Sequence, residues 1–179
     1  PLSLVTTGLT HDSANNIIGV LMRSTDDGHT WSRLPATGIG FGELQLTPDK
    51  TVRFLSWGGL NTSNDFGATW TQIKLPEGKP GRTLDVRWNT GIMAGNFGQV
   101  AMSSDHGATW TQITLSEENA HFTSALLVSD KVGYVAGTES RLYNTTDGGR
   151  TWSRQQLPVA CEILAMTRSG NRIWAVGAK

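Results

Sequence analysis

The chain has 179 residues, and its 15 basic and 15 acidic side chains give a formal net charge of zero. This balance provides no basic face for nucleic acid, and no run of about 18 apolar residues is present that could span a membrane. The single cysteine, Cys161, excludes a disulfide within the chain. We therefore expect no nucleic-acid partner and no membrane span.

The first predicted elements are a strand over residues 2–6, a polar segment over residues 8–16 and a strand over residues 17–23. The second strand runs into a pattern, Ser/Thr-x-Asp-x-Gly-x-Thr-Trp, that occurs four times along the chain. Its tryptophans are spaced 39, 40 and 42 residues apart, a period typical of stacked repeats and propeller blades. The defining residues of the four copies are Ser24, Asp26, Gly28, Trp31, Ser63, Asp65, Gly67, Trp70, Ser103, Asp105, Gly107, Trp110, Thr145, Asp147, Gly149 and Trp152.

Each copy of the pattern predicts a tight turn between two strands. The hydroxyl and carboxylate oxygens can accept hydrogen bonds from the amides that follow them, and the glycine takes a positive φ at little steric cost. Thr-Trp then opens a strand, and we expect the four tryptophans to be largely buried in equivalent environments. The alternative is that the Asp residues bind a metal or act as acids, but the turns lack the further oxygen ligands of a calcium loop. We interpret the pattern as structural and predict neither a metal nor a cofactor.

The remaining predicted strands repeat in a fixed order. No segment keeps a helical apolar period, so we expect an all-β protein. It forms a single domain over residues 1–179, with repeats near 17–57, 58–95, 96–137 and 138–177. The strands before the turns are residues 17–23, 60–63, 99–103 and 141–145, and those after the turns are 30–34, 69–75, 109–115 and 151–157. The next strands, innermost in a propeller, are 43–47, 83–88, 123–129 and 162–168, followed by 52–57, 91–94, 132–136 and 172–176.

The four copies resemble Asp-boxes, the signature of BNR-type β-propeller repeats. Such repeats occur in sialidases, sortilin-type receptors, reducing-end xyloglucan hydrolases and photosystem II assembly factors. The repeat style is most similar to the last group, through Val135-Ala136-Gly137 before Thr145 and Met93-Ala94-Gly95 before Ser103. The four repeats predict a β-propeller built from about four blades of four antiparallel strands each, whereas the resemblance implies a ring of six or more blades. The resemblance also implies an exported, cell-surface or virion location.

The strand count is uneven, because there are four repeat turns and four innermost strands but five second strands. A closed ring then requires that the two ends share one blade, or that a partner chain or a further segment completes it. An open ring would leave unpaired strand edges, which favour association. We expect self-association or a missing segment to close the ring.

Ligands of propellers usually bind at the axial face, which is formed by the loops that enter the innermost strands and those that join second to third strands. Candidate loops are residues 8–16, 35–41, 58–60, 76–82, 95–98, 116–121, 137–141 and 158–161. Polar side chains on these loops and on the innermost strands are the candidate binding residues. They are Glu43, Asp85, Arg87, His121, Glu162, His11 and Asp12.

Two functions compete for this face. The first is a non-enzymatic binding or assembly module that recognises a protein or a glycan, favoured because the sequence contains no complete catalytic set. The second is a glycoside hydrolase fragment, of sialidase or xyloglucan-hydrolase type, that uses axial carboxylates as acid and base. Sialidase chemistry is not supported, since the only tyrosines, Tyr134 and Tyr143, fall at predicted blade-packing positions. We assign no catalytic residue.

Three tryptophans lie outside the repeated pattern, at Trp57, Trp88 and Trp174. Tryptophan can stack on a sugar ring, but all three fall in predicted strands. We therefore expect them to belong to the core.

Overall fold

The structure is a computed structural model, and it describes residues 3–11, 13–15, 17–34, 43–47, 49–56, 59–75, 81–115 and 120–179. Every regular element in these residues is a β-strand, so the all-β prediction is confirmed. The chain divides into two compact units, Pro1–Leu75 and Pro76–Lys179. Each unit is described by itself below.

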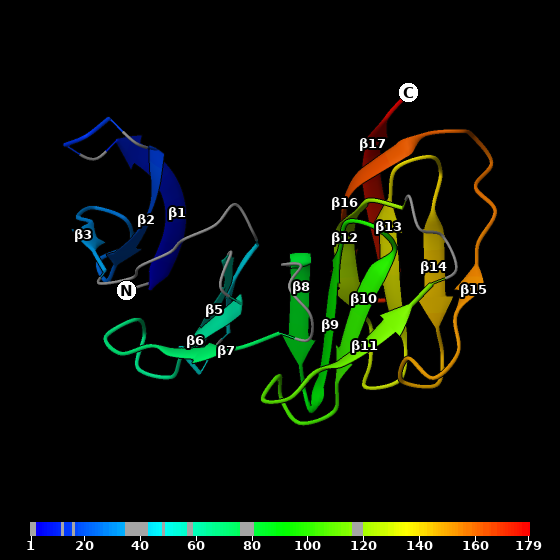
Figure 1. The fold of residues 1–179 in the computed structure, drawn as a ribbon, viewed down its shortest axis with the longest axis horizontal. Helices are drawn as coiled ribbons and strands as arrows, with labels where there is room; N and C mark the ends of the chain where they lie inside the picture. Colours follow the sequence, from blue (N-terminus) through cyan, green and yellow to red (C-terminus); the bar gives the residue numbers. More distant parts are fainter. Residues whose placement is uncertain are drawn as a thin grey trace. The chain divides into compact units, whose positions relative to one another are not determined.

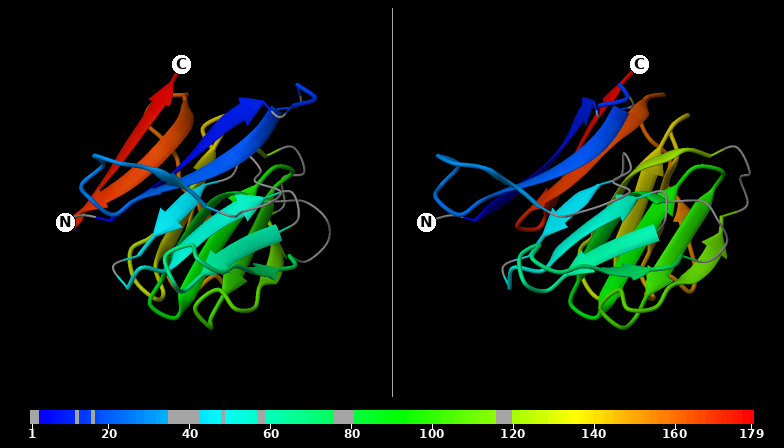
Figure 2. Two further views of the ribbon diagram at one scale, coloured as in Figure 1. Left: turned by 90° about the vertical axis from the view of Figure 1, so that its left-hand side faces the viewer. Right: turned by 60° about the vertical axis from the view of Figure 1, so that its left-hand side comes forward.

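The first unit contains two antiparallel sheets, with strand orders β1-β2-β3 and β4-β5-β6-β7. Figure 2 shows the long β1–β2 hairpin in blue. The strands are β1 (Leu4–His11), β2 (Ile17–Ser24), β3 (Ser32–Arg33), β4 (Leu44–Leu46), β5 (Val52–Ser56), β6 (Gly59–Ser63) and β7 (Thr71–Ile73).

The second unit contains two four-stranded antiparallel sheets and one hairpin, with strand orders β8-β9-β10-β11, β12-β13-β14-β15 and β16-β17. Strand β16 contacts β12 and β13, as Figure 1 shows in orange and yellow. The strands are β8 (Gly81–Arg87), β9 (Thr90–Gly95), β10 (Gln99–Ser103), β11 (Thr111–Thr114), β12 (Phe122–Leu127), β13 (Gly133–Gly137), β14 (Leu142–Thr145), β15 (Ser153–Arg154), β16 (Glu162–Ser169) and β17 (Arg172–Ala178).

The predicted strand order is confirmed, since each complete sheet holds an innermost, second, third and fourth strand in chain order. The first strand was predicted too short. It extends to His11, and its residues pair in continuous register with β2, for example Leu9 with Gly19 and Thr10 with Ile18. The reason is that Leu9 and Thr10 favour an extended backbone and face a run of strand-forming residues. The predicted polar loop over residues 8–16 is therefore shorter than expected.

The core of each unit lies between its sheets. In the second unit, Ile92 and Val100 from one four-stranded sheet pack with Phe122, Val135 and Tyr143 from the next. In the first unit, Leu21 and Leu34 pack against Phe54 and Trp70, whose rings meet edge to face with centroids 5.0 Å apart. Face-to-face packing of sheets buries the apolar side of each strand.

The innermost strands of the second unit are joined by side chains and not by a shared sheet. The Ala125 and Leu127 amides of β12 donate to Thr83 Oγ1 and Asp85 Oδ2 of β8, each at 2.9 Å. The Met166 amide of β16 donates to Ser124 Oγ of β12, also at 2.9 Å. These bonds recur between successive sheets, so they fix how each sheet is placed against the next.

Glycine stands at or next to the end of two second strands in this unit, β13 and β17, because the innermost strand passes very close. A β-carbon at Gly137 would lie 1.9 Å from the carbonyl oxygen of His121, and one at Gly177 would lie 2.0 Å from that of Glu162. Neither contact can be relieved by moving a side chain. The x-x-Gly ending read from the sequence is thus a steric requirement of the fold.

Candidate functional site

The four repeat turns are closed by their own side chains, as the pattern predicts. In the third turn, Ser103 Oγ donates to Asp105 Oδ1 at 2.8 Å and accepts from the Gly107 amide at 2.8 Å. The Thr109 amide and hydroxyl donate to the two Asp105 carboxylate oxygens at 2.8 and 2.5 Å. The turns at Asp26, Asp65 and Asp147 repeat the same bonds. The oxygen atoms of these carboxylates therefore accept hydrogen bonds from within the turn.

Two consecutive residues of each turn take positive φ, although the pattern predicted only the glycine. His106 has φ 58° and Gly107 has φ 82°. The same pair of angles occurs at Asp27 and Gly28, at Phe66 and Gly67, and at Gly148 and Gly149. The carboxylate bonds hold the non-glycine member in a conformation that it rarely adopts.

The tryptophans of the four turns are not equivalent. Trp110 is 9% exposed and Trp31 is 44% exposed, whereas Trp70 and Trp152 are half-buried. The prediction of burial is confirmed for Trp110 and wrong for Trp31. Trp70 packs against the core between the two sheets of its unit. Trp31 directly precedes β3 and has the same local turn. Burial of these tryptophans therefore depends on the neighbouring sheet and not on the turn itself.

The turn carboxylates stay ionised to low pH. Hydrogen bonds from the side chain and backbone of Thr109, and then from Ser103, lower the pKa of Asp105 to about 2. Corresponding bonds from Thr151 lower the pKa of Asp147 to about 2, and the pKa values of Asp26 and Asp65 are lowered in the same way. Each bond favours the charged form because the carboxylate is the acceptor.

The lowered pKa values predict a loss of stability in acid. A carboxyl group whose folded pKa lies below its unfolded value of 3.8 stabilises the fold above that pH, and this contribution disappears as the pH falls toward about 2. Urea unfolding at pH 5 and at about pH 2 should show lower stability at the lower pH. Thr109→Val removes the strongest bond to Asp105, so the variant should lose less stability between the two conditions. An equal loss in both proteins would contradict this assignment.

The structure places Asp85 in a link between sheets. Asp85 is 4% exposed; its carboxylate accepts from the Leu127 amide and, at 2.8 and 3.0 Å, from Nε of Arg87. The Arg87 side chain is 54% exposed. The two residues lie near the end of β8 that leads into the β8–β9 turn, away from the loops predicted to form the axial face.

His121 and Glu162 lie at the other end of the second unit, which we call the loop end: residues 96–98, 120–121, 138–141 and 158–162. Three backbone hydrogen bonds join these segments, from Gly98 to Ala120 at 2.8 Å, from Thr138 to His121 at 3.0 Å and from Ser140 to Cys161 at 2.9 Å. Glu162 is the half-buried first residue of β16. The loop end is therefore one connected surface.

An aromatic residue that the sequence analysis missed stands at the loop end. Phe97 is 49% exposed with φ 60°, and its ring meets the imidazole of His121 edge to face with centroids 5.7 Å apart. The Nδ1 atom of His121 lies 3.1 Å from Asn96 Oδ1. The signal was present in the sequence, because Phe97 and Gly98 lie in the three-residue connection between β9 and β10, where an apolar residue is unusual.

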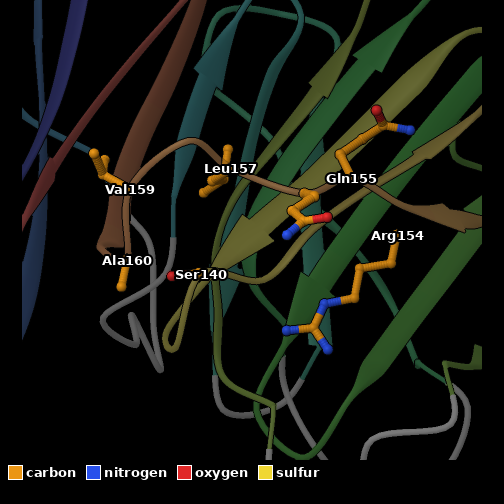
Figure 3. A pocket seen from close by; sticks show the side chains of 7 residues that line it. Ser140, Arg154, Gln155, Leu157, Val159 and Ala160 are labelled. Carbon is orange, nitrogen blue, oxygen red and sulfur yellow. The ribbon is translucent and has the colours of Figure 1, made fainter.

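A surface pocket of about 490 Å³ adjoins the loop end. Figure 3 shows Val159 and Ala160 on one side and Arg154 and Gln155 on the other. Beside it, Arg141 is 8% exposed and forms an ion pair with Glu139 at 2.9 Å. Polar and apolar groups thus line the same hollow, which suits a ligand that carries both.

The other predicted site residues are not brought to this surface by any described contact. Glu43 is exposed beside β4 in the first unit, and its carbonyl accepts from the Leu55 amide at 3.2 Å. His11 is the exposed last residue of β1 and not part of a loop. Asp12 and Trp57 lie outside the described residues, as do the candidate loop over residues 35–41 and most of those over 76–82 and 116–121. Among the described residues, no three His, Cys, Asp or Glu side chains are grouped to hold a metal ion.

The prediction that the other tryptophans belong to the core is wrong for two of them. Trp88 is 52% exposed and Trp174 is 56% exposed. Trp88 lies in the turn that follows β8, one residue beyond the strand. Trp174 lies on β17 opposite Thr167, the position that Ile92 fills on β9 opposite Asp85. Ile92 is covered by the next sheet, whereas β16–β17 is the last pair of strands in its unit.

Solved structures of similar fold were found by comparison. Virginiamycin B lyase from Staphylococcus aureus superposes over 98% of this chain and 68% of its own, with a TM-score of 0.73 and 14% identity. A GH74 xyloglucanase from Xanthomonas campestris gives 0.66 over 92% of this chain at 17% identity, and an ancestral GH74 enzyme gives 0.65 over 78% at 20%. The fold is a β-propeller.

The chain spans only 31% and 21% of the two GH74 enzymes. At these identities the likeness describes the fold and not the activity. No protein-family model matches the chain, and a search of curated proteins finds no match either. No helix in the described residues is both long and apolar enough to cross a membrane.

Proposed function

We propose that the protein is a non-enzymatic binding or assembly module that recognises a protein or a glycan at the axial face of its propeller. In the second unit this face corresponds to the loop end. The observation that carries the proposal is the exposed ring of Phe97, which stands beside His121 and Asn96 on segments joined by backbone bonds. Exposed aromatic residues on a rigid scaffold are typical of recognition surfaces.

The position of Asp85 favours binding over hydrolysis. Its carboxylate was a candidate acid, but the Leu127 amide and Arg87 hold it in a buried link. A carboxyl group that serves as a general acid must reach the proton it transfers. Because the link occupies Asp85, a hydrolase would depend on Glu43, Glu162 or residues of a longer chain. The likeness to GH74 enzymes keeps glycoside hydrolysis as the second candidate.

We further infer that the repeat turns are Asp-boxes of the BNR type. The support is the repeated set of bonds from the Ser or Thr hydroxyl, the Asp carboxylate and the Thr residue in all four turns. Their role is structural, so a ligand should not depend on the turn carboxylates.

Binding and turnover should be measured on the same preparations. We expect a glycan array or a displayed peptide library to yield a ligand for the wild-type protein, and Phe97→Ser to weaken its binding. Leu9→Ser is the control, since Leu9 is 57% exposed but lies on β1 in the first unit. Chromogenic and polymeric glycosides should not be cleaved. If a glycoside is cleaved and Glu43→Gln or Glu162→Gln abolishes that cleavage, the protein is a glycoside hydrolase and the binding proposal is wrong.

A further inference from the structure

Two hairpins of the second unit have turns of the same length and shape. Arg87 pairs with Thr90 across the β8–β9 turn, and Ser169 pairs with Arg172 across the β16–β17 turn. The two-residue turns are therefore Trp88-Asn89 and Gly170-Asn171. In both, the first residue is left-handed, with φ 52° at Trp88 and φ 58° at Gly170.

Glycine is the residue that this position favours, and tryptophan is not. A bulky side chain with positive φ is strained, whereas glycine is not. Trp88 also leaves about half of its surface in solvent, so core packing does not offset the strain. The Gly170 turn shows that the hairpin closes without the indole. A residue that keeps an unfavourable backbone conformation without a gain in packing is a candidate for a functional role.

The residues on either side of Trp88 are held in place. The guanidinium of Arg87 is fixed through Nε by both oxygens of Asp85, which is itself bonded to the Leu127 amide. The carbonyl of Asn89 accepts from the His106 amide at 3.0 Å. The exposed indole therefore projects from a turn whose flanks are anchored, so little backbone freedom would be lost on binding.

A groove of about 560 Å³ begins beside this turn, between the sheets that start with β8 and β12, and both polar residues and the apolar Met102 and Ile113 line it. Asn89 lines it, and Thr90 joins its two walls by donating to the carbonyl oxygen of Asp130 at 3.0 Å. Ser104, Asp130, Lys131 and Arg150 also line it. With Asp147, which also lines it, the groove has two acidic and two basic side chains, so it has no excess charge that would select an anionic or cationic polymer.

We propose that Trp88 is a stacking platform for a sugar ring and that the adjoining groove takes the following units of a neutral glycan. A flat exposed indole matches the apolar face of a pyranose ring. The amide, hydroxyl and charged side chains of the groove provide donors and acceptors for its hydroxyl groups. This surface goes beyond the proposed function, because the loop end and the Trp88 turn lie at opposite ends of β9.

The test compares wild-type protein with Trp88→Gly, which reproduces the turn of the β16–β17 hairpin. The probes are neutral oligosaccharides of glucose, xylose, mannose and galactose, titrated by calorimetry and by following the indole NMR signals. We expect at least one probe to bind and Trp88→Gly to weaken it by about tenfold or more, the loss expected for one stacking contact. The melting temperature of Trp88→Gly should be unchanged or higher. Trp88→Phe should retain part of the affinity.

Trp174→Ser is the matched control, since Trp174 is equally exposed but lies on β17. This variant should bind the probe as the wild type does. The proposal is overturned if no probe binds, if Trp88→Gly binds as well as the wild type, or if Trp174→Ser loses binding to the same degree. A lower melting temperature for Trp88→Gly would show that the turn requires the indole. If a protein binds through Trp88 and no oligosaccharide competes with it, the glycan proposal is wrong and the ligand of Trp88 is a protein.

Discussion

Trp110→Ala should destabilise the second unit by about 3–5 kcal/mol, the usual loss for truncating a large buried side chain. Trp110 is 9% exposed; its ring lies against Gly91 and Gly107, and its Nε1 donates to the Gly107 carbonyl at 2.9 Å. Removal of the ring opens a cavity next to two glycines that cannot fill it. Urea unfolding of the wild type and the variant measures the difference.

Trp31→Ala is the matched control for this experiment. The same turn surrounds Trp31, including the bond from Nε1 to the Gly28 carbonyl at 3.1 Å, but the ring is 44% exposed. The free energy of unfolding should fall by only about 1 kcal/mol in Trp31→Ala, closer to the effect of a surface substitution. Equal losses for the two variants would contradict the difference in burial that the structure shows.

Asp85→Ala should destabilise the second unit by about 2–3 kcal/mol, since the change leaves a buried amide without its charged acceptor. The amide is that of Leu127, which is 1% exposed, and the guanidinium of Arg87 loses its anchor as well. Asp85→Asn is the control, because an amide oxygen can still accept from Leu127. It should cost less than the alanine variant. Unchanged stability in Asp85→Ala would contradict the structural role of this carboxylate and make Asp85 a candidate acid again.

The sequence predicted the strands and turns because the information for them is local. The Asp105 turn is closed by residues at most four positions apart. The glycine at the end of the second strand, as at Gly137, is required wherever the innermost strand crosses it. The turn pattern recurs in all four repeats, so repetition alone made it visible.

The site was harder to predict because it depends on distant contacts. From the sequence, Asp85 is interpreted as a candidate acid at the axial face. In the structure its carboxylate accepts from the Leu127 amide, which is 42 positions away. Trp31 and Trp110 have the same local pattern but different burial, since burial depends on the neighbouring sheet. The sequence places Trp88 in a strand and Phe97 in a loop, but both residues have positive φ, 52° and 60°. The sequence signals a turn at Phe97-Gly98, but it does not report the left-handed backbone of either aromatic residue.

The closure of the propeller stays a prediction. Strand β17 pairs only with β16 in the described sheets, and Trp174 and Val176 are 56% and 64% exposed on it. The corresponding residues of β9, Ile92 and Ala94, are covered by the sheet that follows. A surface of this kind is expected to be covered by a further blade, from the N-terminal strands of the same chain, from a partner or from a longer chain.

Successive sheets of the second unit are held together as blades by side chains that accept hydrogen bonds from the amides of the next innermost strand. Amide hydrogen exchange at Ala125, Leu127 and Met166 tests this arrangement most directly, because these amides donate to Thr83, Asp85 and Ser124. All three should exchange slowly in the wild type. Asp85→Ala should accelerate Leu127 while Met166 stays protected. Three amides that exchange as fast as those of an unfolded chain would contradict the blade arrangement.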